Sequence, residues 1–205
     1  MKKASLNLPN TLSLIRCLLV PVFVVALLFM REIKIWGVIV PAIIYGITAF
    51  TDMLDGKIAR KYNLVTDFGK FIDPLADKFM VIGSAISILV WMMLRAMDSG
   101  RPEDLLLPQI FVWVVLVILL RELGVTSLRL VVAGKSGIVV AASLLGKIKT
   151  VSQMAGTVII LVEPLIPYFC DNHILSYVSM GIMAFTTLFS GLDYLKAYMP
   201  HISMD

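Results

Sequence analysis

Four aspartates, Asp52, Asp55, Asp73 and Asp77, fall within one short stretch of a chain that is otherwise mostly apolar. Apolar runs of membrane length flank the stretch on both sides. A carboxylate inside a membrane segment is costly to bury without a partner, so such acids mark functional sites. Carboxylate oxygens are the ligands of hard divalent cations, which in turn bind phosphate. The stretch therefore predicts a metal site that holds a phosphorylated substrate.

The spacing of the aspartates predicts that they lie on two facing helical stripes, because a helix turns by about 100° per residue. The first stripe contains Asp52, Asp55, Gly56 and Ala59, and the second contains Gly69, Asp73 and Asp77. A short turn joins the two helices, so we expect them to be antiparallel neighbours. Four carboxylates brought together would repel one another in a low dielectric. Two divalent cations bridging a shared phosphate would remove that repulsion.

Gly56 and Ala59 leave space beside the aspartates for a bulky ligand to approach the helix backbone. Close packing of two helices at small residues is the alternative. Arg60, one turn beyond Gly56, can bind phosphate through two parallel hydrogen bonds, or it can simply mark the membrane boundary. For the aspartates themselves, the alternatives are ion pairs with Lys57, Arg60 or Lys78 and an ion or proton pathway through the membrane.

The composition indicates the scaffold that must position these groups. The chain is 59% hydrophobic and 16% charged, and its mean hydropathy is +0.92, which indicates an integral membrane protein. No linker divides it, so we expect one domain over residues 1–205. The predicted fold is all-α and polytopic, with six transmembrane helices at Leu12–Met30, Ile33–Leu54, about Asp67–Met97, Leu105–Val132, Ile138–Val162 and Ile174–Tyr198.

Three local features refine this prediction. Thr66 can cap the third helix, and Pro74 should kink that helix or free a backbone carbonyl. Turns are expected at Arg60–Val65 and Ala133–Gly137. Six spans place both termini on one side, and that side carries fourteen of the 18 lysines and arginines. The positive-inside rule makes it cytoplasmic, so the aspartates should line a polar cavity that opens to the cytoplasm.

From Asp52 to Asp77 the sequence reads D-x2-D-G-x2-A-R-x8-G-x3-D-x3-D. It resembles the signature of the CDP-alcohol phosphatidyltransferase family, with all eight fixed residues present. Four further elements, Leu8–Arg16, Asp73–Lys78, Arg121–Arg129 and Gly146–Thr150, are similar to one branch of that family, the phosphatidylglycerophosphate synthases. The first of them departs from the branch at Ser13, where threonine is usual. The resemblance covers about residues 7–195.

The resemblance implies a six-helix membrane enzyme, usually a homodimer, that moves the phosphatidyl group of CDP-diacylglycerol to an alcohol and releases CMP. For this branch the alcohol is sn-glycerol 3-phosphate. The resemblance makes Asp52, Asp55 and Asp73 metal ligands, and makes Asp77 both a ligand and the general base. It places Gly56, Ala59, Arg60 and Gly69 at the cytidine diphosphate. The metal would be Mg²⁺ or Mn²⁺, as two ions, and no nucleic-acid partner is expected.

A phosphate-bearing acceptor is a dianion and needs fixed positive charge. Five cations in the second half of the chain are candidates to bind it, namely Arg121, Arg129, Lys135, Lys147 and Lys149. Arg121 and Arg129 are eight residues apart and share a broad helix face. Pairing of either arginine with Glu122 is the alternative role. Other acceptors, as in a cardiolipin synthase or a phosphatidylinositol phosphate synthase, remain open, and so does a divalent-cation or proton transporter.

Overall fold

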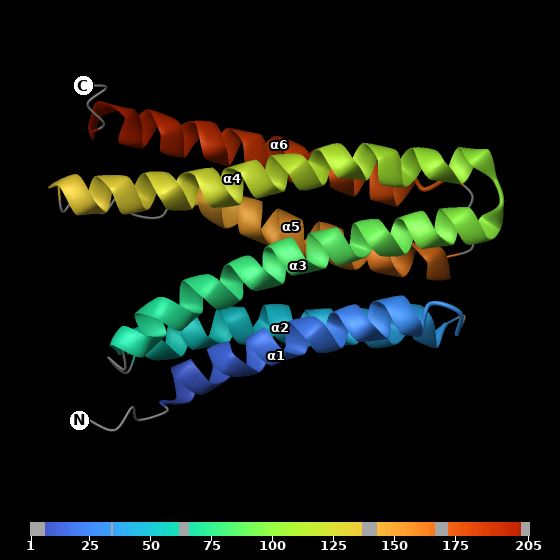
Figure 1. Ribbon diagram of the computed structural model, residues 1–205, viewed down its shortest axis with the longest axis horizontal. Helices are drawn as coiled ribbons and strands as arrows, with labels where there is room; N and C mark the ends of the chain where they lie inside the picture. Colours follow the sequence, from blue (N-terminus) through green and yellow to red (C-terminus); the bar gives the residue numbers. More distant parts are fainter. Residues whose placement is uncertain (1–6, 34, 62–65, 137–142, 167–171, 202–205) are drawn as a thin grey trace.

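The computed structural model of the chain is a bundle of long helices (Figure 1). It describes residues 7–33, 35–61, 66–136, 143–166 and 172–201, with the backbone alone for residues 9, 53–61, 67, 70, 135, 136 and 201. Within these ranges the regular structure is entirely helical. The predicted all-α class is therefore confirmed.

Six α-helices form the bundle: α1 (Leu8–Phe29), α2 (Trp36–Lys61), α3 (Asp67–Ser99), α4 (Leu106–Ser136), α5 (Leu144–Val162) and α6 (Ile174–Tyr198). The short 3-10 helices η1 (Pro102–Leu105), η2 (Glu163–Leu165) and η3 (Met199–His201) extend α-helix ends. Successive α-helices run in opposite directions, so both chain ends lie at the same end of the bundle (Figure 1). The order and number of the helices match the six predicted spans.

Two predicted turns are shorter than expected. α2 continues through Arg60 to Lys61, and α4 continues to Ser136 through most of the predicted Ala133–Gly137 turn. Alanine, lysine and arginine are good helix formers, and they extend a helix once it has formed. Both helices therefore project beyond the length that their apolar runs indicate.

Hydroxyl caps set the start of two helices. The predicted cap at Thr66 is confirmed, because its Oγ1 accepts a hydrogen bond of 3.0 Å from the backbone N–H of Gly69. α5 starts at Leu144 and not at the predicted Ile138, because Ser143 caps it by accepting from the N–H of Gly146 at 3.1 Å. In both cases the side-chain oxygen satisfies a backbone donor that the first turn leaves open.

Within the described residues, five helices are long and apolar enough to cross a membrane, namely α1, α3, α4, α5 and α6. Over the side chains that the structure describes, α2 contributes the apolar stretch Trp36–Asp52. Large apolar side chains cover the outside of the bundle: Phe29, Trp113 and Leu120 are 79%, 71% and 77% exposed. Such a surface suits lipid rather than water. The chain is a multi-pass membrane protein.

Helix α1 is central to the half of the bundle that carries the aspartates, since it packs against both α2 and α3. α4 contacts α3 and α6, and α5 contacts α2 and α6. One core cluster joins all six helices, with buried members that include Phe23, Tyr45, Ile88, Ile118, Leu161 and Met183. Pro74 lies inside α3, which continues through it. Because α1 touches both aspartate-bearing helices, its polar residues can reach both stripes.

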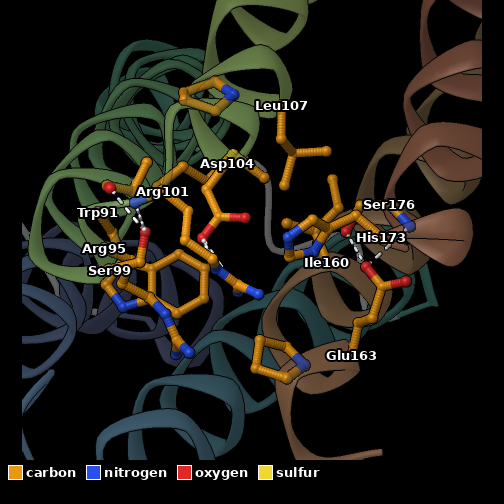
Figure 2. Close-up of a pocket in the computed structure, with 14 residues that line it drawn as sticks. Trp91, Arg95, Ser99, Arg101, Asp104, Leu107, Ile160, Glu163, His173 and Ser176 are labelled. Atoms are coloured by element: carbon orange, nitrogen blue, oxygen red, sulfur yellow. Dashed lines mark hydrogen bonds and ion pairs between the residues drawn. The ribbon is translucent and has the colours of Figure 1, made fainter. Parts of the chain in front are cut away.

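The end of the bundle opposite the termini holds a polar cavity of about 190 Å³ (Figure 2). Its two carboxylates, Glu163 and Asp104, contact a helix start and an arginine, respectively. The carboxylate of Glu163 accepts hydrogen bonds of 2.8 and 3.0 Å from the N–H groups of Leu175 and Ser176 at the start of α6. Arg101 lies 3.1 Å from Asp104. This cavity is remote from the aspartates, which lie at the end that carries the termini.

Candidate active site

Helix α1 supplies two side chains that hold predicted metal ligands in place. Arg16 Nη1 lies 2.5 Å from Asp52 Oδ1 on α2. Ser13 Oγ donates a hydrogen bond of 2.6 Å to Asp73 Oδ1 on α3. Ser13 and Arg16 are one helical turn apart, and they are 0% and 1% exposed. Asp52 and Asp73, which come from different helices, are therefore fixed at the same level of α1.

Asn10, one turn before Ser13, ties the start of α1 to the start of α3. Its Nδ2 donates a hydrogen bond of 2.9 Å to Thr66 Oγ1, the oxygen that caps α3. Gly69 is buried against this junction, and a Cβ at this position would lie 2.7 Å from Asn10 Oδ1. Close packing of α1 on α3 thus gives a reason for glycine here that is independent of the predicted nucleotide site.

Asp77, the predicted base, lies one turn after Asp73 on α3. Its side chain is 38% exposed, and its Oδ2 is 3.4 Å from Lys78 Nζ. The pairing with Lys78 that the sequence left open is therefore present, and the carboxylate stays accessible. Lys78 Nζ also lies 2.5 Å from Glu122 Oε2, so it connects the aspartates to a second group of charges.

That second group, which we call the Glu122 cluster, consists of Glu122, Lys78, Arg121 and Lys149. The Glu122 side chain is 0% exposed, and its carboxylate contacts the three cations, which come from α3, α4 and α5. Arg121 Nη1 is 3.0 Å from Oε1, and Nη2 donates a hydrogen bond of 2.8 Å to Ser190 on α6. The pairing of Arg121 with Glu122, which the sequence left as an alternative, is confirmed. Three cations against one carboxylate leave a surplus of two positive charges.

The other predicted acceptor-site cations lie at varied positions around this cluster. The guanidinium carbons of Arg121 and Arg129 lie 5.3 and 5.9 Å from the centre of the Tyr194 ring, within the range of a cation–π contact. Lys147 is exposed. It is two residues from Lys149, hence about 200° around the helix, on another side of α5. The structure therefore groups Arg121, Arg129 and Lys149 and leaves Lys147 apart.

Five predicted site residues have side chains outside the described part of the structure, namely Asp55, Gly56, Ala59, Arg60 and Lys135. The first four belong by backbone to α2, and Lys135 belongs to the last turn of α4. The helical backbone of the four α2 residues agrees with the stripe predicted for that helix. Their roles stay predictions.

The described acidic side chains fit a hard divalent cation by their chemistry. Asp52, Asp73 and Asp77 offer oxygen donors, and a neighbouring side chain contacts each carboxylate, as is usual around metal sites. Among the side chains that the structure describes, no three acidic, histidine or cysteine groups are close enough together to hold a metal ion. The predicted set of four includes Asp55, so it lies partly beyond the described side chains.

Sequence reasoning gave no site role to four residues that the structure places here: Ser13, Arg16, Lys78 and Glu122. Ser13 and Arg16 belong to the amino-terminal element whose resemblance to the family was recognised, and Glu122 belongs to the Arg121–Arg129 element. A charged or polar residue inside an apolar run was the available signal. The sequence could not indicate which partner each residue contacts.

Comparison with known proteins extends the resemblance over the chain. The family model for CDP-alcohol phosphatidyltransferase matches residues 6–190. The chain is 38% identical over 202 residues to the CDP-diacylglycerol–glycerol-3-phosphate 3-phosphatidyltransferase of Bacillus subtilis (strain 168), covering 93% of this chain and 94% of the relative. It is 33% identical over 205 residues to the protein of the same name from Pseudomonas fluorescens, covering 98% and 94%.

A third relative is the probable phosphatidylglycerophosphate synthase of Mycobacterium tuberculosis (strain H37Rv), 35% identical over 189 residues, with 92% of this chain and 80% of the relative covered. These matches span the oriented aspartates on α2 and α3 and the Glu122 cluster alike. Signature, architecture and full-length relatives agree, and the chain belongs to the CDP-alcohol phosphatidyltransferase family.

Proposed function

We propose that the protein transfers the phosphatidyl group of CDP-diacylglycerol to sn-glycerol 3-phosphate, giving phosphatidylglycerophosphate and CMP. The names of its full-length relatives support this reaction. The structural observation that carries the proposal is the contact between Asp77 and the Glu122 cluster through Lys78. It sets an accessible carboxylate beside a surplus of positive charge. An acceptor with a hydroxyl at one end and a phosphate at the other needs the carboxylate for the hydroxyl and the positive charge for the phosphate.

The aspartates on α2 and α3 are proposed to hold two divalent cations, Mg²⁺ or Mn²⁺, through Asp52, Asp55, Asp73 and Asp77. When bound, such ions would neutralise the pyrophosphate of CDP-diacylglycerol and the departing CMP. The protein's own part is to hold the carboxylates in position. Arg16 and Ser13 do this for Asp52 and Asp73 from α1.

Asp77 is proposed to take the proton from the attacking hydroxyl of the acceptor. The oxygen of that hydroxyl then attacks the phosphorus of the phosphatidyl group, and the bond from that phosphorus to the CMP oxygen breaks. A side-chain carboxylate within hydrogen-bond reach suits this proton transfer. The exposure of Asp77 supports the role, because the acceptor must reach it. Direct displacement needs no covalent intermediate on the protein.

The phosphate of the acceptor is proposed to lie at the cations of the second group. Lys78, Arg121 and Lys149 are gathered by Glu122, and Arg129 lies close by over Tyr194. Lys135, in the last turn of α4, would contribute from the same end of the bundle, whereas Lys147 lies on another side of α5. Gly56, Ala59, Arg60 and Gly69 are proposed to line the site of the cytidine diphosphate group. An acceptor without a phosphate would leave the positive surplus unpaired, which disfavours it.

The same reasoning orients the protein in the membrane. We propose that the end with both termini faces the cytoplasm, because most lysines and arginines lie there. The site would then meet water-soluble glycerol 3-phosphate on one side and the lipid tails of CDP-diacylglycerol on the other. A homodimer, as is usual in the family, is proposed as the assembly.

Two alternatives make different predictions. If the acceptor is a different alcohol, the aspartates would keep their proposed role, but the cations of the Glu122 cluster would bind another group. A cation or proton transporter would need a polar path through the bundle. The full-length relatives, which are named as phosphatidyltransferases, favour the transferase.

The test is CMP release from CDP-diacylglycerol by the purified protein, with and without glycerol 3-phosphate, in Mg²⁺ and then in EDTA. We expect release only when both the acceptor and the metal are present. Metal-dependent release with phosphatidylglycerol or an inositol phosphate alone would keep the family and overturn the acceptor. Ion flux into proteoliposomes without CMP release would overturn the transferase.

A further inference from the structure

We infer that Glu122 is a positioning residue for the acceptor, and that its carboxylate fixes Lys78, Arg121 and Lys149 as one seat for the acceptor's phosphate. The inference rests on the proposed function and deepens it. Glu122 is 0% exposed, so it acts through the cations and does not touch the substrate itself. What it determines is where three positive charges lie relative to Asp77.

Each oxygen of the Glu122 carboxylate has its own partners. Oε2 lies 2.5 Å from Lys78 Nζ on α3. Oε1 lies 3.0 Å from Arg121 Nη1 on α4 and also accepts a hydrogen bond from Lys149 Nζ on α5. The two oxygens contact cations from different helices. The carboxylate therefore sets the distances between the three cations and also offsets part of their charge. Charge-assisted hydrogen bonds of this kind are strong and directional.

A carboxylate inside a site for an anion has a physical reason. Three cations at contact distance repel one another in a poorly screened interior. The single negative charge of Glu122 holds Lys78, Arg121 and Lys149 together and leaves a surplus of two positive charges. A phosphate monoester with two negative charges complements that surplus. The cluster is thus assembled before the acceptor arrives, and binding does not have to order it.

Side-chain exposure rises along the cluster in the direction of Asp77. Lys149 is 4% exposed, Arg121 is 10%, Lys78 is 25% and Asp77 is 38%. The seat therefore opens toward the proposed base. An acceptor whose phosphate meets Lys78 would place its free hydroxyl beside Asp77, so the position of Lys78 sets both binding and alignment. Of the two carboxylates beside Lys78 Nζ, Glu122 at 2.5 Å is nearer than Asp77 at 3.4 Å.

Glu163 offers a matched contrast within the same chain. It is as buried as Glu122, at 1% exposure, but its carboxylate accepts hydrogen bonds from the backbone of Leu175 and Ser176 at the start of α6. That is the behaviour of a helix cap. Glu163 lines the cavity at the opposite end of the bundle, with His173 and Ser176 beside it in Figure 2. The substitution Glu163→Gln therefore removes a buried carboxylate without touching the seat.

The test compares Glu122→Gln, Glu122→Asp and Glu163→Gln with the unaltered protein. The KM for glycerol 3-phosphate and that for CDP-diacylglycerol are measured separately, with inorganic phosphate as a competitive inhibitor. For Glu122→Gln we expect the acceptor KM and the inhibition constant of phosphate to rise about tenfold or more, as when a partner that orients a binding group is lost. The KM for CDP-diacylglycerol should stay within about twofold. Glu122→Asp should be intermediate, and Glu163→Gln should leave both KM values unchanged.

Tighter phosphate binding by Glu122→Gln would overturn the inference, because it would mean that only the net charge of the cluster matters. An equal rise in both KM values would also overturn it, as a general loss of structure. If Glu122→Gln does not fold, the Glu122→Asp variant tests the inference instead. An unchanged KM for glycerol 3-phosphate in Glu122→Asp would refute the positioning role of Glu122. The rise in melting temperature on adding inorganic phosphate needs no turnover. It tests the seat even if the unaltered protein fails to release CMP, so the two proposals fail separately.

Discussion

Replacement of Arg16 by leucine tests whether α1 positions the aspartates. Removing one partner of a buried ion pair costs about 3–5 kcal/mol. Arg16 is 1% exposed, but Asp52 is 24% exposed, so water can hydrate the carboxylate that remains. We therefore expect a loss of about 2–3 kcal/mol, below the fully buried range. For a chain of this size, 1 kcal/mol corresponds to about 2–4 °C, so the melting temperature should fall by about 4–12 °C.

The same change should lower CMP release well below the melting temperature. Without Arg16, Asp52 loses a contact that orients its carboxylate, and loss of such a partner beside a metal ligand, the role proposed for Asp52, costs about 10–100-fold in activity or metal affinity. A titration of Mg²⁺ in the assay separates the two effects. We expect the Mg²⁺ concentration for half-maximal rate to rise, and Arg16→Lys, which keeps the charge, should recover part of the loss.

Arg101→Leu is the matched control, because Arg101 and Asp104 form an ion pair of 3.1 Å whose arginine is 53% exposed. Exposed pairs contribute about 0–1 kcal/mol, so this variant should melt within a few degrees of the unaltered protein. Its Mg²⁺ dependence should not change. An Arg16→Leu variant with the stability and Mg²⁺ dependence of Arg101→Leu would refute the idea that α1 orients Asp52.

Two further substitutions test the site. Asp77→Asn should abolish CMP release while binding of CDP-diacylglycerol, followed by equilibrium binding of a labelled lipid, stays largely intact; full activity would exclude Asp77 as the base. Gly69→Ala should lower stability by about 1–3 kcal/mol, because its Cβ would lie 2.7 Å from the buried Asn10 Oδ1 and overpacking costs that much. Gly181→Ala, whose Cβ would meet nothing within 4 Å, should be neutral or stabilising in the same melting experiment.

The features that the sequence predicted well are those encoded by local periodicity. The helical stripe of Gly69, Asp73 and Asp77 follows from a four-residue spacing, and the cap at Thr66 follows from a hydroxyl before a helix. Helix ends were less predictable. Ser143 caps α5 although an apolar run precedes it, and the competition between cap and run is not visible in hydropathy.

The contacts that position the aspartates could not be predicted, because they join residues far apart in sequence. Ser13 and Asp73 are 60 residues apart, and their contact depends on α1 packing against both α2 and α3. Hydrophobic periodicity shows which face of a helix is buried, but not which neighbour covers it. For the same reason Glu122 was recognised as a possible partner of Arg121, while its contacts with Lys78 and Lys149 were not foreseen.

The arrangement of charges explains why the site lies where it does. Isolated charges are costly within a membrane, and the buried charges near the site are paired, Arg16 with Asp52 and Lys149 with Glu122. Charge remains in surplus at the accessible part of the site, negative at the aspartates and positive at the Glu122 cluster. Divalent cations would complement the first surplus and an acceptor phosphate the second. The substrates would thus complete a charge balance that the folded chain alone leaves open.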